Sequence, residues 1–90
     1  MALEWDERKR RATLAERGID FVDVQRMFRG RVEEREDTRR DYGERRFVVV
    51  GELDGGIISV VYTWRGGTRR LISARRATRR ERKEYQAGPG

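Results

Sequence analysis

Apolar and polar residues alternate most regularly in the second half of the chain. FVVVGEL, IISVVYTW and RRLISA are three β-rich runs, and they are separated by the turn sequences DGG at 54–56 and RGGT at 65–68. Glycine-containing turns between runs of this kind are typical of hairpins. The pattern therefore predicts an antiparallel meander of three strands.

The first half of the chain shows helical spacing. We predict a helix over residues 6–17, with Asp6 as its N-cap and Gly18 ending it in the left-handed conformation. Asp20 is placed to cap a second, short helix, FVDVQRMF, whose apolar residues recur at i, i+3, i+6 and i+7. That apolar stripe is predicted to belong to the core.

Residues 29–45 mix both charges around a single valine and a single tyrosine, which predicts a solvated edge strand followed by a loop. After the meander, Thr78 and Glu81 have the spacing of a capping box that opens a last helix. The expected fold class is α+β, with two N-terminal helices, a four-stranded antiparallel sheet and one C-terminal helix. We assign residues 1–86 to a single domain and 87–90 to a flexible tail.

A two-residue turn at 66–67 would fix the register of the last two strands. Positions that face each other then sum to 133, so Trp64 faces Arg69 and Val61 faces Ile72. Because side chains alternate between the faces of a strand, one face is predicted to hold Val60, Tyr62, Trp64, Arg69, Leu71, Ser73 and Arg75, and the other Ser59, Val61, Thr63, Arg70, Ile72 and Ala74. Both faces keep an apolar middle, which predicts a helix or a partner on each.

The basic residues are concentrated in one part of the chain. The chain has 22 basic residues, 20 of them arginine, against 16 acidic residues, and its net charge is +6. The segment 65–83 alone holds nine cations and one anion, so the rest of the chain has a net charge of −2. Such polarity is typical of a nucleic-acid binder, and arginine suits phosphate oxygens, although a GC-rich genome also favours arginine codons.

The composition excludes several kinds of chemistry. The chain has no cysteine and no histidine, so disulfides and thiol chemistry are absent, a metal site would need carboxylates alone, and we predict neither a metal nor a cofactor. No apolar run reaches the roughly 18 residues of a membrane span, which predicts a cytoplasmic protein without membrane contact. With 36% apolar and 42% charged residues, the chain can form only a small core. We therefore predict that a partner supplies part of the stability.

Four segments together resemble a known family. EWDERK near the N-terminus, a helix ending at GIDF, a meander containing VVYTWRGG and the final ISARRATRRERKEY are similar to the BrnT toxins of bacterial type II toxin–antitoxin systems, over nearly the whole chain. The resemblance implies a RelE-like ribonuclease that inhibits translation. It also implies a BrnA-like antitoxin with a ribbon-helix-helix domain, a complex with two copies of each protein, and contact with operator DNA only through the antitoxin.

The chain departs from the family pattern in its first helix. Thr13 and Arg17 stand where the family usually has asparagine and histidine. A guanidinium stays protonated at any relevant pH, so Arg17 cannot act as a base.

RNA can be cleaved without a metal when its own 2′-hydroxyl is the nucleophile, which requires a base, an acid and cations beside the phosphorane. Arg75 is the first candidate cation, because it ends a strand at the N-terminus of a helix, where anions bind. The predicted catalytic residues are Arg75, Arg70, Lys9 and Tyr62, with Glu81 and Tyr85 as further candidates for the base or acid. The predicted RNA-binding residues are Arg65, Arg69, Arg76, Arg79, Arg80, Arg17 and Tyr85.

Two classes of function therefore stay open. One is a ribonuclease toxin whose basic surface binds RNA and is covered by the antitoxin. The other is a nucleic-acid-binding or protein-interaction module that uses the same surface without chemistry, in which the arginines lie on a solvated helix and the aromatic residues only pack. The missing histidine favours the module, and the near full-length resemblance favours the toxin.

Overall fold

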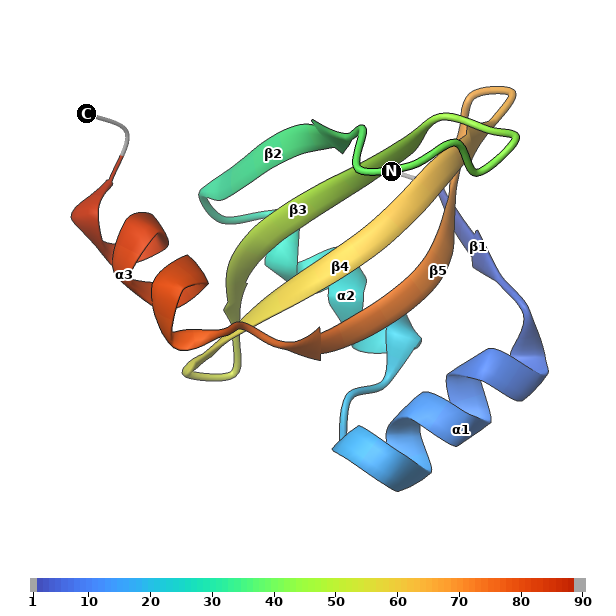
Figure 1. The fold of residues 1–90 in the computed structure, drawn as a ribbon. Helices are drawn as coiled ribbons and strands as arrows, with labels where there is room; N and C mark the ends of the chain where they lie inside the picture. Colours follow the sequence, from blue (N-terminus) through green and yellow to red (C-terminus); the bar gives the residue numbers. More distant parts are fainter. Residues whose placement is uncertain (1, 89–90) are drawn as a thin grey trace.

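The computed structural model describes residues 2–88, which form one five-stranded sheet with helices on both faces (Figure 1). The elements in chain order are β1 (Leu3–Trp5), α1 (Glu7–Arg17), the 3₁₀ turn η1 (Phe21–Asp23), α2 (Val24–Met27), β2 (Val32–Asp37), β3 (Arg46–Leu53), β4 (Gly56–Arg65), β5 (Thr68–Arg76) and α3 (Arg79–Ala87). The strand order is β1-β5-β4-β3-β2. The predicted α+β class, the edge strand β2 and the meander β3-β4-β5 are confirmed.

The prediction of four antiparallel strands is wrong in one strand. β1 is a fifth strand, and it pairs parallel with β5, Leu3 opposite Arg69 and Trp5 opposite Leu71. Three residues are too few to show alternation in the sequence, and their pairing joins segments more than sixty positions apart. Only the folded chain reveals this strand.

The two N-terminal helices begin at the predicted caps. The Asp6 carboxylate accepts from the backbone N–H groups of Arg8 and Lys9, and Gly18 ends α1 with φ 70°. The second helix differs from the prediction of one continuous helix. It starts as the turn η1, where the Asp20 carboxylate accepts from the backbone N–H of Val22, and becomes α-helical only in α2.

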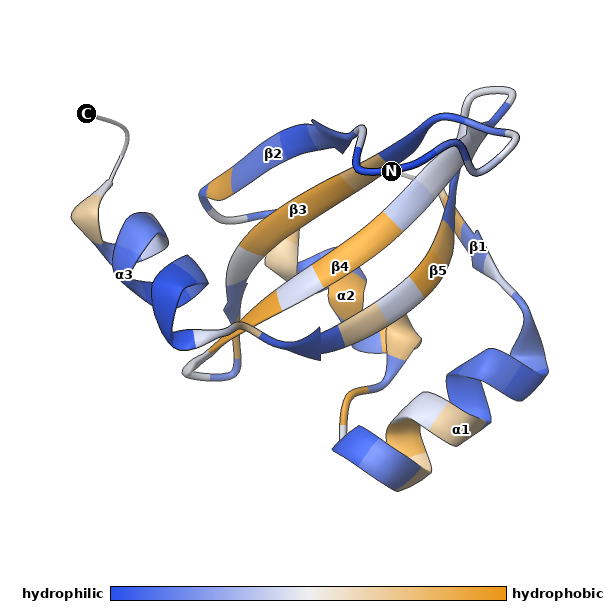
Figure 2. Ribbon diagram, in the orientation of Figure 1, coloured by the Kyte–Doolittle hydropathy of each residue, from blue (hydrophilic) through white to orange (hydrophobic). Residues whose placement is uncertain are grey.

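The core lies between the sheet and the segment η1-α2, which passes behind β3 and β4 in Figure 1. Its most buried side chains are Phe21, Val24, Met27, Val49, Ile58, Val60, Tyr62, Leu71 and Ala74. The Met27 side chain of α2 packs directly against Gly51, where a Cβ atom would lie 2.7 Å from Met27 Cγ. Of the helices within residues 2–88, α3 alone lies on the opposite face, beside β3, and Figure 2 shows apolar residues along the three central strands.

A bulge changes the predicted faces of β5. Trp64 pairs with Arg69 and Tyr62 with Leu71, as predicted, but the register shifts at Val61, which pairs with Ser73 instead of Ile72. One extra residue in a strand reverses the faces beyond it. The predicted faces of Ser73, Ala74 and Arg75 are therefore wrong: Ala74 is fully buried in the core opposite Val60, and Arg75 lies on the face that carries α3.

The last helix has the predicted capping box. The Thr78 hydroxyl accepts from the Glu81 backbone N–H, and the Glu81 carboxylate accepts from the Thr78 backbone N–H. The helix continues through Ala87, the first residue of the predicted tail, and residues 89–90 of that tail lie outside the described residues. No helix within residues 2–88 is long and apolar enough to cross a membrane.

Candidate functional site

Aromatic side chains gather where β4 ends and β5 begins, on the core face just past the end of α2. The Tyr62 ring stacks on Phe47 with centroids 5.5 Å apart, and it makes edge contacts with Phe28 at 6.5 Å and Trp64 at 5.5 Å. We call these four residues, together with Arg69, the Arg69 cluster. The cluster closes one end of the core and has a rigid aromatic surface.

The guanidinium of Arg69 lies over three of these rings. Its Cζ atom is 4.7 Å from the Phe28 centroid, 5.1 Å from Tyr62 and 4.6 Å from Trp64. Stacking on ring faces holds a cation in place without neutralising its charge. Arg69 forms no ion pair with any residue in the range 2–88, and its buried Nε lacks a hydrogen-bond partner there. A phosphate bound beside the guanidinium would supply the missing negative charge.

The hydroxyl of Tyr62 donates a hydrogen bond of 2.5 Å to Glu34 Oε1 on β2. Tyr62 is only 1% exposed. Burial and the Glu34 carboxylate raise the pKa of the phenol above its ordinary value of 10, and the nearby Arg69 opposes that rise. The phenol therefore stays protonated near neutral pH.

Trp64 is the exposed member of the cluster, at 45%. A cavity beside it is lined by Glu44, Arg45, Phe47, Thr63, Trp64 and Arg65. The ring is thus open to solvent next to arginine side chains, and an unpaired base can stack on such a ring.

The predicted cations Arg75 and Arg70 lie elsewhere, and each is paired. Arg75 donates to both carboxylate oxygens of Glu81, at 2.7 and 3.1 Å. This pairing, with the backbone bond from Thr78, lowers the pKa of Glu81 to about 2 despite its burial. Arg70 donates to Glu4 of β1 at 2.7 Å. Both charges are therefore compensated within the chain.

Three other predicted residues lie in separate parts of the molecule. Lys9 is exposed on α1, and Arg17 donates to the Ala74 carbonyl at 2.9 Å. Tyr85 attaches α3 to the sheet: its hydroxyl donates to the Arg31 carbonyl at 2.7 Å, and the Arg31 guanidinium lies 3.9 Å from its ring centroid. These contacts indicate that Arg17 and Tyr85 stabilise the fold.

The four remaining arginines, Arg65, Arg76, Arg79 and Arg80, are all exposed. Arg80 pairs with Glu84 at 3.1 Å, whereas the other three form no ion pair within the described part of the chain. The structure brings Tyr62 and Arg69 together. It separates them from Arg75, which lies six residues further along β5, about 20 Å away, on the opposite face of the sheet.

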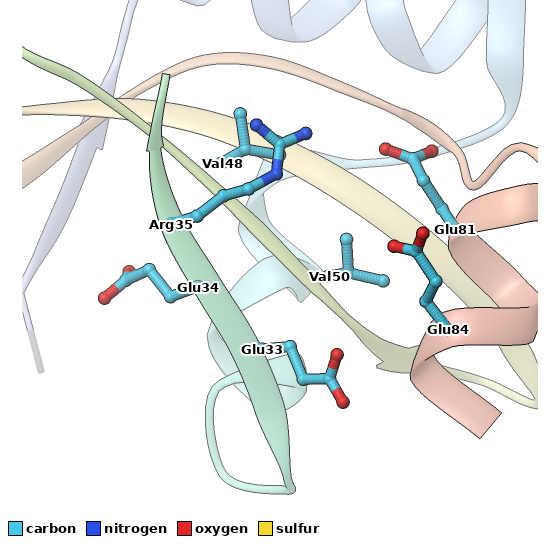
Figure 3. A pocket seen from close by; sticks show the side chains of 7 residues that line it. All are labelled: Glu33, Glu34, Arg35, Val48, Val50, Glu81 and Glu84. Atoms are coloured by element: carbon cyan, nitrogen blue, oxygen red, sulfur yellow. The ribbon is translucent and has the colours of Figure 1, made fainter. Parts of the chain in front are cut away.

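A cavity of about 170 Å³ is lined mainly by acidic residues. It lies between β2, β3 and α3, with Val48 and Val50 as its floor (Figure 3). The residues that line it are Glu33, Glu34, Arg35, Val48, Val50, Glu81 and Glu84. Carboxylates from both walls disfavour a phosphate ligand inside this cavity.

Glu34 was missed by the sequence reasoning. It stands in VEERED, where five of six residues are charged, and no periodicity shows which of the three glutamates meets a buried tyrosine. The register of β2 on β3, with Glu34 opposite Val49, turns it toward the core face. No group of three or more His, Cys, Asp or Glu side chains that could hold a metal ion is found in residues 2–88.

The fold and its surface define a small, basic α+β domain with an uncompensated arginine held on an aromatic cluster, the combination that suits a polyanion. Residues 5–81 match the family described as ribonuclease toxin, BrnT, of type II toxin-antitoxin system, so the chain belongs to the BrnT family of ribonuclease toxins. A toxin of this type has an antitoxin partner. No curated protein matches the chain significantly.

Proposed function

We propose that this chain is an endoribonuclease that cleaves RNA without a metal ion, acts in the cytoplasm and thereby inhibits translation. The observation that carries the proposal is the Arg69 guanidinium, which lies over three aromatic rings without an ion pair in the described chain. A fixed cation aimed at a developing phosphorane is worth about 3 kcal/mol. The adjacent, exposed Trp64 supplies a stacking surface for a base.

RNA reaches this site along a basic surface. Arg65 extends next to Trp64, and Arg76 and Arg79 present unpaired cations near the other end of β5. In this proposal Arg70 and Arg75 contact phosphates only when RNA displaces Glu4 and Glu81 from them. Lys9 on α1 and Arg80 on α3 add to the field that attracts the strand.

The same proposal includes an antitoxin that inhibits the ribonuclease activity. We infer a BrnA-like protein with a ribbon-helix-helix domain and a complex with two copies of each chain, which binds operator DNA through the antitoxin alone. The family membership supports an antitoxin partner. Growth arrest on expression of this chain, relieved when the neighbouring antitoxin gene is co-expressed, is the result expected in cells.

The decisive experiment is cleavage of a single-stranded RNA by the purified chain in excess EDTA. We expect cleavage to persist, and Arg69→Ala to slow it about 100-fold or more, because the phosphorane loses its cation. Arg11→Ala, which removes an exposed and unpaired cation from α1, is the matched control and keeps nearly full activity. Loss of cleavage in EDTA would refute the metal-free reaction, and RNA binding without cleavage would establish the non-catalytic module instead.

A further inference from the structure

Glu34 differs from the other acidic residues of β2. Glu33 pairs with Arg31, Glu36 with Arg45 and Asp37 with Arg39. Glu34 forms no ion pair with any residue between 2 and 88, and its bonding partner is the phenol of Tyr62. It is therefore the one carboxylate of this strand whose negative charge is not compensated by an arginine within the described chain.

Glu34 and Tyr62 differ in solvent exposure, so they can have different roles in a reaction. Tyr62 is 1% exposed and is packed between Phe47, Phe28 and Trp64, so RNA cannot contact it. Glu34 is exposed on the edge strand. Its Oε1 atom accepts the phenol hydrogen at 2.5 Å, which fixes the carboxylate and leaves Oε2 available to a substrate.

We propose that Glu34 is the general base of the cleavage reaction and that Tyr62 is its positioning residue, an assignment that rests on the proposed ribonuclease function. Arg69 stacks on the same tyrosine ring, so the base and the phosphate-binding cation are both placed by Tyr62. A base and a cation held on one rigid ring keep a constant geometry during the reaction.

The step balances without a further reactant. Glu34 removes the proton of a 2′-hydroxyl, the 2′-oxygen forms a bond to the adjacent phosphorus, and the bond from phosphorus to the 5′-oxygen breaks. The 5′-oxygen takes a proton from water, and Glu34 returns its proton to solvent. The products are a 2′,3′-cyclic phosphate and a 5′-hydroxyl, and Arg69 faces the phosphorane between them.

The test is single-turnover cleavage of a single-stranded RNA oligonucleotide by the full chain, followed across a range of pH. Glu34→Gln is expected to lower the rate about 10²- to 10⁴-fold with little change in RNA affinity. Glu33→Gln, on the opposite face of the same strand, is the control and stays near the parent rate.

Tyr62→Phe separates positioning from packing, because it keeps the ring and removes only the hydroxyl. We expect cleavage to slow about 10- to 100-fold while the melting temperature and RNA affinity stay close to those of the parent. The double variant with Glu34→Gln should be no slower than Glu34→Gln alone, because the two groups act as a unit. Additive losses would contradict the positioning assignment.

The outcomes distinguish this inference from the function on which it rests. If the parent chain cleaves RNA and Glu34→Gln cleaves it equally fast, the base is another group and the ribonuclease function stands. Cleavage of an RNA with a 2′-deoxy substitution at the scissile position would refute the step itself. If the parent chain leaves RNA intact, both proposals fall.

Discussion

Burial decides what each side chain of the candidate site can do. Tyr62 and Trp64 lie two residues apart on one strand, yet the first is 1% exposed and the second 45%. Arg69 and Arg75 share β5 and the same chemistry, but Arg75 forms an ion pair with Glu81, whereas Arg69 lies over aromatic rings and has no ion pair within residues 2–88. Residue type alone does not distinguish a reactive group from a structural one.

At this scale we predict that Trp64→Ala weakens binding of single-stranded RNA by about 1–3 kcal/mol, because a base loses its stacking surface. Trp64→Phe should recover most of the loss, since a phenyl ring also stacks. Val22→Ala removes another exposed apolar side chain, 50% exposed and distant in sequence, and serves as the control. Fluorescence titration with an RNA oligonucleotide measures the affinities, and equal affinity of Trp64→Ala and the parent would contradict the stacking site.

The junction of β5 and α3 shows how elements cooperate. The bulge at Val61 turns Arg75 toward the face that carries α3, where it meets the same Glu81 that completes the capping box. One carboxylate therefore fixes the helix start and attaches it to the strand. Tyr85 holds the other end of α3 through Arg31.

Because of this arrangement, the free energy of unfolding depends on pH in the acidic range. The pKa of Glu81 falls from an ordinary 4.5 to about 2 in the folded chain. The contribution of Glu81 to the free energy of unfolding is therefore complete above pH about 4.5 and is lost as pH falls toward about 2. Glu81→Gln should cost about 1–2 kcal/mol at neutral pH, below the full linkage value because Arg75 is 43% exposed, and should flatten the acid dependence.

Urea unfolding at several pH values measures this effect. Glu84→Gln is the matched control, because Glu84 and Arg80 of the same helix form a solvent-exposed pair, which contributes little. An equal loss for both variants, or an unchanged acid dependence in Glu81→Gln, would show that the pair does not anchor α3.

The whole molecule is electrically polarised and has a small core. Nine of its 22 cations lie in residues 65–83 with a single anion, while the cavity between β2, β3 and α3 is lined by glutamates. The sheet face away from η1 and α2 is covered only at its edge, by α3 (Figure 1). We expect a toxin with such a small core to gain stability when its antitoxin binds.

We therefore predict that saturating antitoxin raises the melting temperature by about 10–20 °C. Binding at 100 times the dissociation constant is worth about 2.7 kcal/mol, and 1 kcal/mol shifts the melting temperature of a domain of this size by about 4–8 °C. Differential scanning fluorimetry with and without the antitoxin measures the shift, and an unrelated ribbon-helix-helix protein is the control. An unchanged melting temperature would contradict the stabilisation.

Several features of fold and site were predictable from sequence because they are local. The caps at Asp6, Asp20 and Thr78 depend on a few neighbouring residues, and the glycine turns set the meander in the same way. Tyr62 and Arg69 were also among the candidate residues, although nothing in the sequence placed them together. Their contact depends on the pairing of β4 with β5.

The sequence by itself determined the helix starts, the three-stranded meander, the edge strand and the concentration of positive charge, since short-range backbone preferences and summed charge need no knowledge of distant contacts. The tertiary structure alone decided that β1 joins the sheet, that a bulge turns Arg75 to Glu81, and that Glu34 meets Tyr62. Those outcomes depend on strand register and burial, which the whole chain settles at once as it packs.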